Sequence, residues 1–86
     1  MNEHLMRAVI QSAAFLELSG DDIIHPDAAV RELESLSESL QMLNATERKV
    51  FADFAARYAD SELKANQPQQ RVEFIRSLPQ ALGLVD

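Results

Sequence analysis

The residues that can do chemistry are most concentrated in a short segment that reads DDIIHPD. This segment contains Asp21, Asp22, His25 and Asp27. Carboxylate oxygens together with one imidazole nitrogen can ligate a divalent cation. The spacing is not that of a calcium-binding loop, however, and the other histidine, His4, is distant in the chain. We therefore expect His25 to close the start of a helix, assign no metal ligand, and keep a small metal-binding protein as the second alternative function.

Other catalytic patterns do not occur in the chain. No serine lies in a Gly-x-Ser-x-Gly elbow that would expose a nucleophile. The two glycines, Gly20 and Gly83, are too far apart to form a phosphate-binding loop. The absence of cysteine excludes thiolate metal sites and cysteine nucleophiles. We therefore predict no catalytic residue, no cofactor and no enzymatic activity.

The distribution of charge is the most informative feature of the sequence. Fourteen acidic and eight basic residues give a net charge of -6. The whole excess lies between Glu17 and Glu38, where seven acids accompany one base, Arg31, whereas the rest of the chain has seven of each. Phosphate neutralisation needs a basic face, so nucleic acid is not expected as a partner. A basic protein is the complementary partner, because opposite charges steer association.

Part of this excess falls on one face of a predicted helix. Asp27, Glu34 and Glu38 share an outward helical face with Arg31. One interpretation is a solvated face whose first-turn acid complements the helix dipole. The other is a docking surface for a basic partner protein.

Apolar residues occur within and beside the acidic stretch. Phe15 lies roughly 145° from the centre of the apolar stripe on its own helix, and Ile23 and Ile24 lie in an acidic connector. With Leu18, these residues either close one end of a helix bundle or form an apolar anchor with an acidic rim. The predicted partner-binding site comprises Glu17, Asp21, Asp22, Ile23, Ile24, Asp27, Glu34, Glu38 and Phe15.

Apolar residues recur at three- and four-residue steps along nearly the whole chain, and no stretch alternates with a period of two. This pattern predicts four helices. They run from about Asn2 to Leu18, from Pro26 along a leucine seam that ends at Leu43, from after Asn44 to about Lys64, and from about Pro68 to Pro79.

Several residues are predicted to begin, end or stabilise these helices. Asn2 can cap the first helix, and Asn44 with Glu47 resembles a capping box at the third. Gly20 is predicted at a left-handed exit position, and Pro79 is predicted to end or kink the last helix before a turn that closes at Gly83. Charges on the third helix are spaced for i,i+4 pairing. These charges are Lys49, Asp53, Arg57, Asp60 and Lys64.

The helices and their short connections predict one all-α domain spanning residues 1–86. An up-down-up-down four-helix bundle is the simplest arrangement. The rival is a helical hairpin plus a cap completed by dimerisation, because a chain this short buries only about 60–65% of its unfolded surface. Monomer and homodimer are therefore both open.

In length, acidity and helical class the chain resembles the small immunity proteins that neutralise bacterial nuclease toxins. That resemblance implies an acidic surface that covers a basic toxin. The motif of a tyrosine pair with a proline that marks the colicin immunity group is absent, since Tyr58 is the only tyrosine. No residue roles are carried over, and an immunity- or antitoxin-like inhibitor is the first alternative function.

The longest unbroken apolar run covers only residues 13–16. A membrane helix needs about 20 apolar residues, and a secretory signal needs a longer apolar core than this one. We expect a cytoplasmic protein without a membrane partner. The leading prediction is a non-enzymatic helical interaction module, adaptor or regulatory, that presents residues 17–38 to a basic protein.

Overall fold

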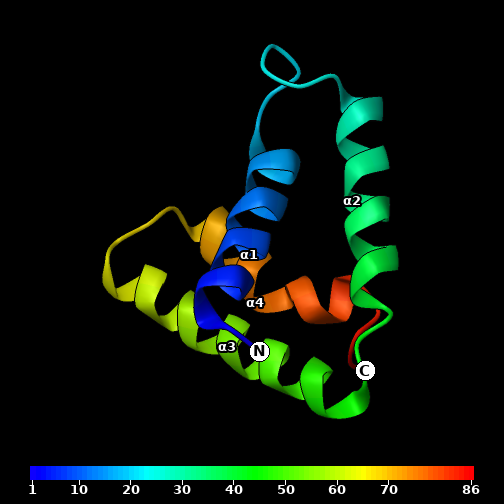
Figure 1. Cartoon of the computed structure of the whole chain (residues 1–86). Helices are drawn as coiled ribbons and strands as arrows, with labels where there is room; N and C mark the ends of the chain where they lie inside the picture. Colours follow the sequence, from blue (N-terminus) through cyan, green and yellow to red (C-terminus); the bar gives the residue numbers. More distant parts are fainter.

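The computed structural model describes all 86 residues and contains four α-helices and no strand (Figure 1). Along the chain these are α1 (Glu3–Leu18), α2 (Pro26–Leu40), α3 (Ala45–Lys64) and α4 (Gln69–Ala81). The prediction of an all-α, small four-helix bundle is confirmed.

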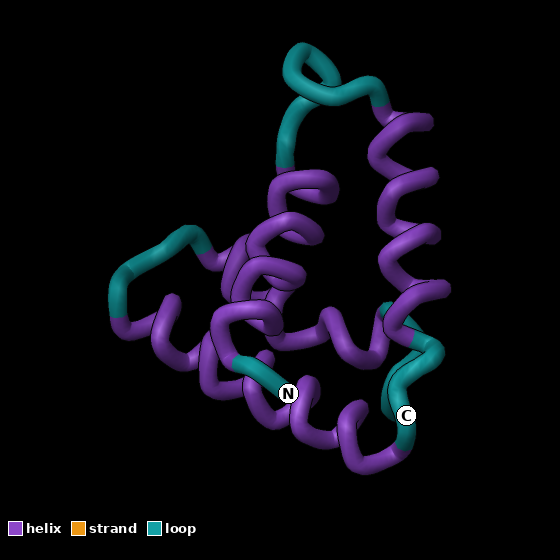
Figure 2. The backbone as a smooth tube through the Cα atoms, viewed as in Figure 1, coloured by secondary structure: helices purple, strands orange, loops and turns teal.

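The four helices form two hairpins that pack against each other through α1 (Figure 2). Helix α1 contacts each of the other three helices, and α3 contacts α4. The backbone of α2 lies close to that of α1 but not to that of α3 or α4, although Leu40 in its last turn reaches the common core. The α1–α2 hairpin therefore projects from the α3–α4 pair, and its connecting loop lies at the end farthest from α3 (Figure 1).

The hydrophobic core lies mainly between α1, α3 and α4. Of α2, only Leu40 belongs to the main buried cluster, whereas Leu33 and Leu36 of the predicted seam are half-buried at its edge. The seam thus turns inward as predicted, but it is incompletely covered. The buried cluster from the other elements consists of Met6, Ile10, Ala13, Phe51, Phe54, Ala55, Ala59, Val72, Ile75, Leu78, Leu82 and Leu84.

The predicted helix starts are confirmed. The Asn2 side chain accepts hydrogen bonds from the backbone N–H groups of His4, at 2.7 Å, and Leu5, at 3.3 Å. Asn44 and Glu47 form a complete capping box, with N···O distances of 2.8 and 3.0 Å. Such caps satisfy N–H groups that have no partner within the helix.

The end of α4 differs from the prediction at Pro79. The helix does not end there but continues to Ala81, with Pro79 buried inside it. A proline inside a helix removes the hydrogen bond that its N–H would donate four residues back and crowds that carbonyl, so the last turn of α4 forms despite this cost. Gly83, at φ 73°, then closes a Schellman motif in which the Leu84 N–H donates to the Pro79 carbonyl at 2.9 Å.

The prediction of a left-handed Gly20 is wrong. Helix α1 ends instead with Ser19 in an extended conformation, and Gly20 has no positive φ. A Cβ on Gly20 would lie 2.6 Å from Asp22 Oδ1, the end of a flexible side chain. Left-handed residues at helix ends occur instead at Gly83 and at Asn66, which follows α3 and has φ 58°.

The last turn of α2 is fastened to the C-terminal segment by hydrogen bonds. The Leu82 carbonyl, at the cap of α4, accepts from Gln41 Nε2 at 2.6 Å and from Ser37 Oγ at 3.2 Å. Arg48 donates to the Gln41 carbonyl at 2.6 Å and to the Leu43 carbonyl at 3.0 Å. Polar contacts thus supplement the burial of Leu40 in attaching the end of α2 to the rest of the protein.

Replacing Gln41 with Ala should destabilise the fold, because it removes the shorter bond to the Leu82 carbonyl. The expected loss is about 1 kcal/mol, or ~4–8 °C in Tm for a domain of this size. Thermal unfolding followed by circular dichroism measures it. Gln70→Ala, at an exposed glutamine without such a bond, is the matched control. Equal melting of the two variants would contradict this role for Gln41.

Candidate functional site

The seven carboxylates of the acidic stretch between Glu17 and Glu38 all lie on exposed residues, and none takes part in an ion pair. Every ion pair of the molecule uses an acid outside this stretch. These pairs are Lys49–Asp53, Arg57–Glu3, Arg71–Glu62 and Arg76–Asp60. The excess negative charge of the sequence therefore has no ion-pair partner within the protein.

The pattern of pairing differs in part from the i,i+4 pairs predicted for α3. Lys49 and Asp53 pair as expected. Arg57 instead pairs with Glu3 of α1 at 3.2 Å, and Asp60 accepts from Arg76 of α4 at 2.9 Å. Basic residues of α3 and α4 are thus used to link helices, which leaves the α1–α2 hairpin acidic.

An apolar groove of about 420 Å³ lies between α2 and α4. Val30 and Leu33 of α2 face Phe74 of α4 across it, and Val30 is 54% exposed. Two carboxylates, from Glu17 of α1 and Glu34 of α2, also line the groove. No basic residue does. The groove therefore combines an apolar floor with acidic edges.

A second hollow of about 170 Å³, at the tip of the hairpin, shares Glu17, Val30 and Leu33 with this groove. Its lining adds Asp21 and the half-buried Ile24. The two hollows therefore adjoin at these three side chains. Four of the predicted partner-binding residues line one surface: Glu17, Asp21, Ile24 and Glu34.

Phe15 lies apart from this groove. It lines a shallow hollow of about 410 Å³ together with Glu32 and residues of α1. Phe15 is 56% exposed and Ile23, in the loop, is 65% exposed, so the interpretation that they close the bundle end does not hold for these two. Leu18 and Ile24 are half-buried and cover part of that end.

The remaining predicted residues, Asp22, Asp27 and Glu38, are exposed and line none of these hollows. The backbone N–H of Asp27 donates to His25 Nδ1 at 3.1 Å, so His25 caps α2 as expected. No three His, Asp or Glu side chains lie close enough together to hold a metal ion.

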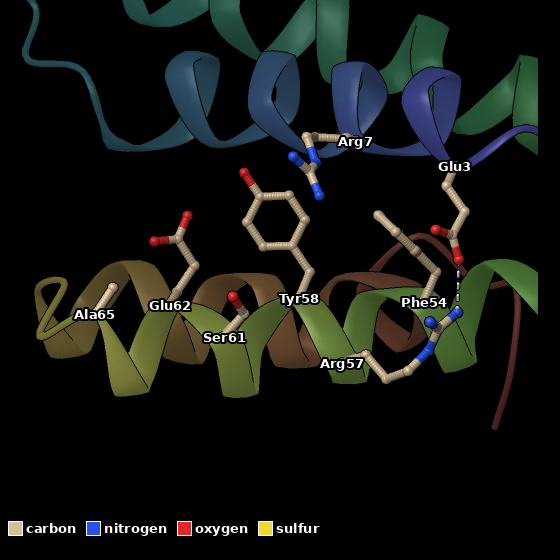
Figure 3. Close-up of a pocket in the computed structure, with 8 residues that line it drawn as sticks. All are labelled: Glu3, Arg7, Phe54, Arg57, Tyr58, Ser61, Glu62 and Ala65. Carbon is tan, nitrogen blue, oxygen red and sulfur yellow. Dashed lines mark hydrogen bonds and ion pairs between the residues drawn. The ribbon is translucent and has the colours of Figure 1, made fainter.

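A further hollow, of about 340 Å³, lies between α1 and α3 (Figure 3). Its charged side chains already have partners within the protein. Glu3 pairs with Arg57, and the Arg7 guanidinium lies 5.5 Å from the centre of the Tyr58 ring. Glu62 accepts two hydrogen bonds from Arg71, at 3.0 and 3.2 Å. The side chains that line this hollow thus link α1, α3 and α4 through these contacts.

The groove residues Val30, Phe74 and Ala81 are not among the predicted partner-binding residues. Each lies one position away from an inward-facing residue, which places it at the flank of its helix. Such flank residues are covered in a tightly closed bundle and exposed in an open one. The apolar Val30, next to Ala29 of the seam, is the signal that could have indicated the groove.

Fold and surface together define a small acidic all-α protein with an open apolar groove beside an unpaired acidic surface. No protein-family model, characterised protein or solved structure matches this chain. None of its helices has the length and apolar character needed to cross a bilayer.

Phe15→Ala should leave stability nearly unchanged, with a change within about 0.5 kcal/mol, because the ring is largely exposed. Ile10→Ala is the contrasting control, since Ile10 is fully buried and its truncation should cost about 2–5 kcal/mol. Urea unfolding of both variants gives the two values. A loss for Phe15→Ala approaching that for Ile10→Ala would assign Phe15 to the core.

Proposed function

We propose that this protein is a non-enzymatic helical interaction module, adaptor or regulatory, that binds a basic protein through residues 17–38. It would act in the cytoplasm, as a monomer or homodimer, without a cofactor or a membrane partner. The observation that carries the proposal is the set of seven exposed carboxylates with no basic partner.

Unpaired carboxylates on one hairpin favour a basic partner for two physical reasons. They produce a negative potential that raises the association rate of a positively charged protein. They also lose no intramolecular ion pair when a partner's lysines and arginines approach. The potential extends about 10 Å at 0.1 M salt, so both effects should weaken as salt rises.

The basic residues of the chain support protein rather than nucleic acid as the partner. Lys49, Arg57, Arg71 and Arg76 each pair with a carboxylate. A phosphate backbone would have to compete with these carboxylates and would meet a net charge of -6.

A more specific version of this function is inhibition of a basic bacterial toxin, in the manner of an immunity protein or antitoxin. The unpaired acidic surface on a small helical body favours it. Tyr58 supplies no equivalent of the tyrosine pair, because its ring packs edge-to-face on Phe54 at 5.9 Å and lies under Arg7. This version predicts a gene for a basic toxin beside the gene for this protein.

Reversing three charges of the acidic stretch should abolish capture of the partner. We expect Glu32→Lys, Glu34→Lys and Glu38→Lys together to lose proteins that the wild type captures from a lysate of the native organism. The matched control is Asp53→Lys, Glu73→Lys and Asp86→Lys, which changes the net charge equally and breaks no ion pair between helices. Quantitative mass spectrometry compares the three baits.

The control separates a local surface from overall charge. If the control loses the same proteins as the triple reversal, net charge alone governs binding and the local surface is not used. If every captured protein binds all three baits equally, the acidic surface is not a docking site and the proposed function is wrong.

A further inference from the structure

We infer that the groove between α2 and α4 binds an amphipathic helix of the partner, with an apolar face against the groove and lysine or arginine along its edges. This inference rests on the proposed function and specifies where and how the basic partner binds.

The position beside α2 is that of a missing helix neighbour. A helix in a four-helix bundle normally packs along two neighbours, but the backbone of α2 runs close to that of α1 alone. The flank that it leaves uncovered presents Val30 and half-buried Leu33, and α4 presents Phe74 and Ala81 on the other side. Covering this flank would bury apolar surface that the isolated chain leaves in water.

The α2 side of the groove has a length that a bound helix can use. Val30, Leu33 and Ser37 of α2 line it at steps of three and four residues, so it follows the helix axis over ~10 Å. Helix-in-groove recognition uses apolar anchors at positions i, i+3 or i+4, and i+7 of the bound helix, which span a similar length.

Charge complementarity identifies the chemistry of the helix. Glu17 and Glu34 line the groove, Asp21 lines the hollow that adjoins it, and neither hollow contains a basic residue. These carboxylates have no ion-pair partner in the protein. A helix with lysines or arginines beside its apolar face would pair with them, whereas an acidic helix would be repelled.

The same charges disfavour a second copy of this chain as the occupant. Two copies facing each other across their grooves would bring Glu17, Asp21 and Glu34 of both together. Each copy carries a net charge of -6. Repulsion between like charges at the rim opposes such a dimer.

The test uses model peptides of about 18 residues, long enough to span the groove. The first contains only leucine and lysine, with the leucines on one helical face. The second is an isomer of the same composition with no apolar face, and the third carries glutamate in place of lysine. Isothermal titration calorimetry gives the affinities, and sedimentation of the free protein gives its oligomeric state.

Two neutral substitutions at exposed residues separate the groove from the rest of the surface. Val30→Asn should weaken binding of the amphipathic basic peptide about tenfold, the effect of one lost buried apolar side chain. Leu63→Asn, the matched control at an exposed apolar residue of α3 that lines none of the hollows, should leave the affinity unchanged. Glu17→Gln with Glu34→Gln should weaken binding and reduce its salt dependence. Circular dichroism confirms that each variant is folded.

The outcomes distinguish failure of the inference from failure of the proposed function. Equal affinity of Val30→Asn and wild type, with weaker binding by Glu17→Gln/Glu34→Gln, would overturn the groove but retain the acidic docking surface. Unchanged binding by Glu17→Gln/Glu34→Gln, or equal binding of the acidic peptide, would overturn the acidic edge of the groove and with it the inference, whereas the proposed function is overturned by the charge-reversal capture described above. Equal binding of the isomer would overturn the helical occupant. A dimer of the free protein that Val30→Asn dissociates would show that a second copy occupies the groove.

Discussion

The apolar groove and the acidic surface of this protein depend on one packing constraint, which is that the backbone of α2 runs beside that of α1 alone. Helix α1 contacts every other helix, so its far side is committed to α3 and α4. Ala29 of α2 is buried although it lies outside the main core cluster, which is consistent with packing against α1 alone. Hydrogen bonds from Ser37 and Gln41 to the Leu82 carbonyl fasten the other end of α2. The flank between these attachments remains open.

The same constraint explains why the negative charge is uncompensated. Basic residues pair with carboxylates that neighbouring elements bring within reach, as Arg71 does with Glu62 between α4 and α3. The backbones of α3 and α4 do not run close to that of α2, and none of their arginines or lysines pairs with an acid between Glu17 and Glu38. Arg31 is the only base of this stretch, and it forms no ion pair. Open packing thus produces both the apolar groove and its acidic edges.

Local features could be predicted from the sequence, whereas contacts between helices could not. The Asn44–Glu47 capping box depends on residues three apart, and the seam of α2 follows from helical periodicity. Periodicity indicates which face turns inward but not how many helices cover it, so the exposure of Val30 was missed. The Arg57–Glu3 pair joins α3 to α1, and no local pattern on either helix specifies it.

The most direct test of this account is NMR relaxation of methyl groups by small soluble nitroxides that differ only in charge. An exposed groove with an acidic rim predicts that the Val30 methyls relax strongly, and more with a cationic nitroxide than with an anionic one. The half-exposed Leu63 on α3 is the reference for a smaller charge dependence, and the fully buried Ile75 is the reference for protection. Protection of Val30 equal to that of Ile75, or equal relaxation by the two charged probes, would contradict the account.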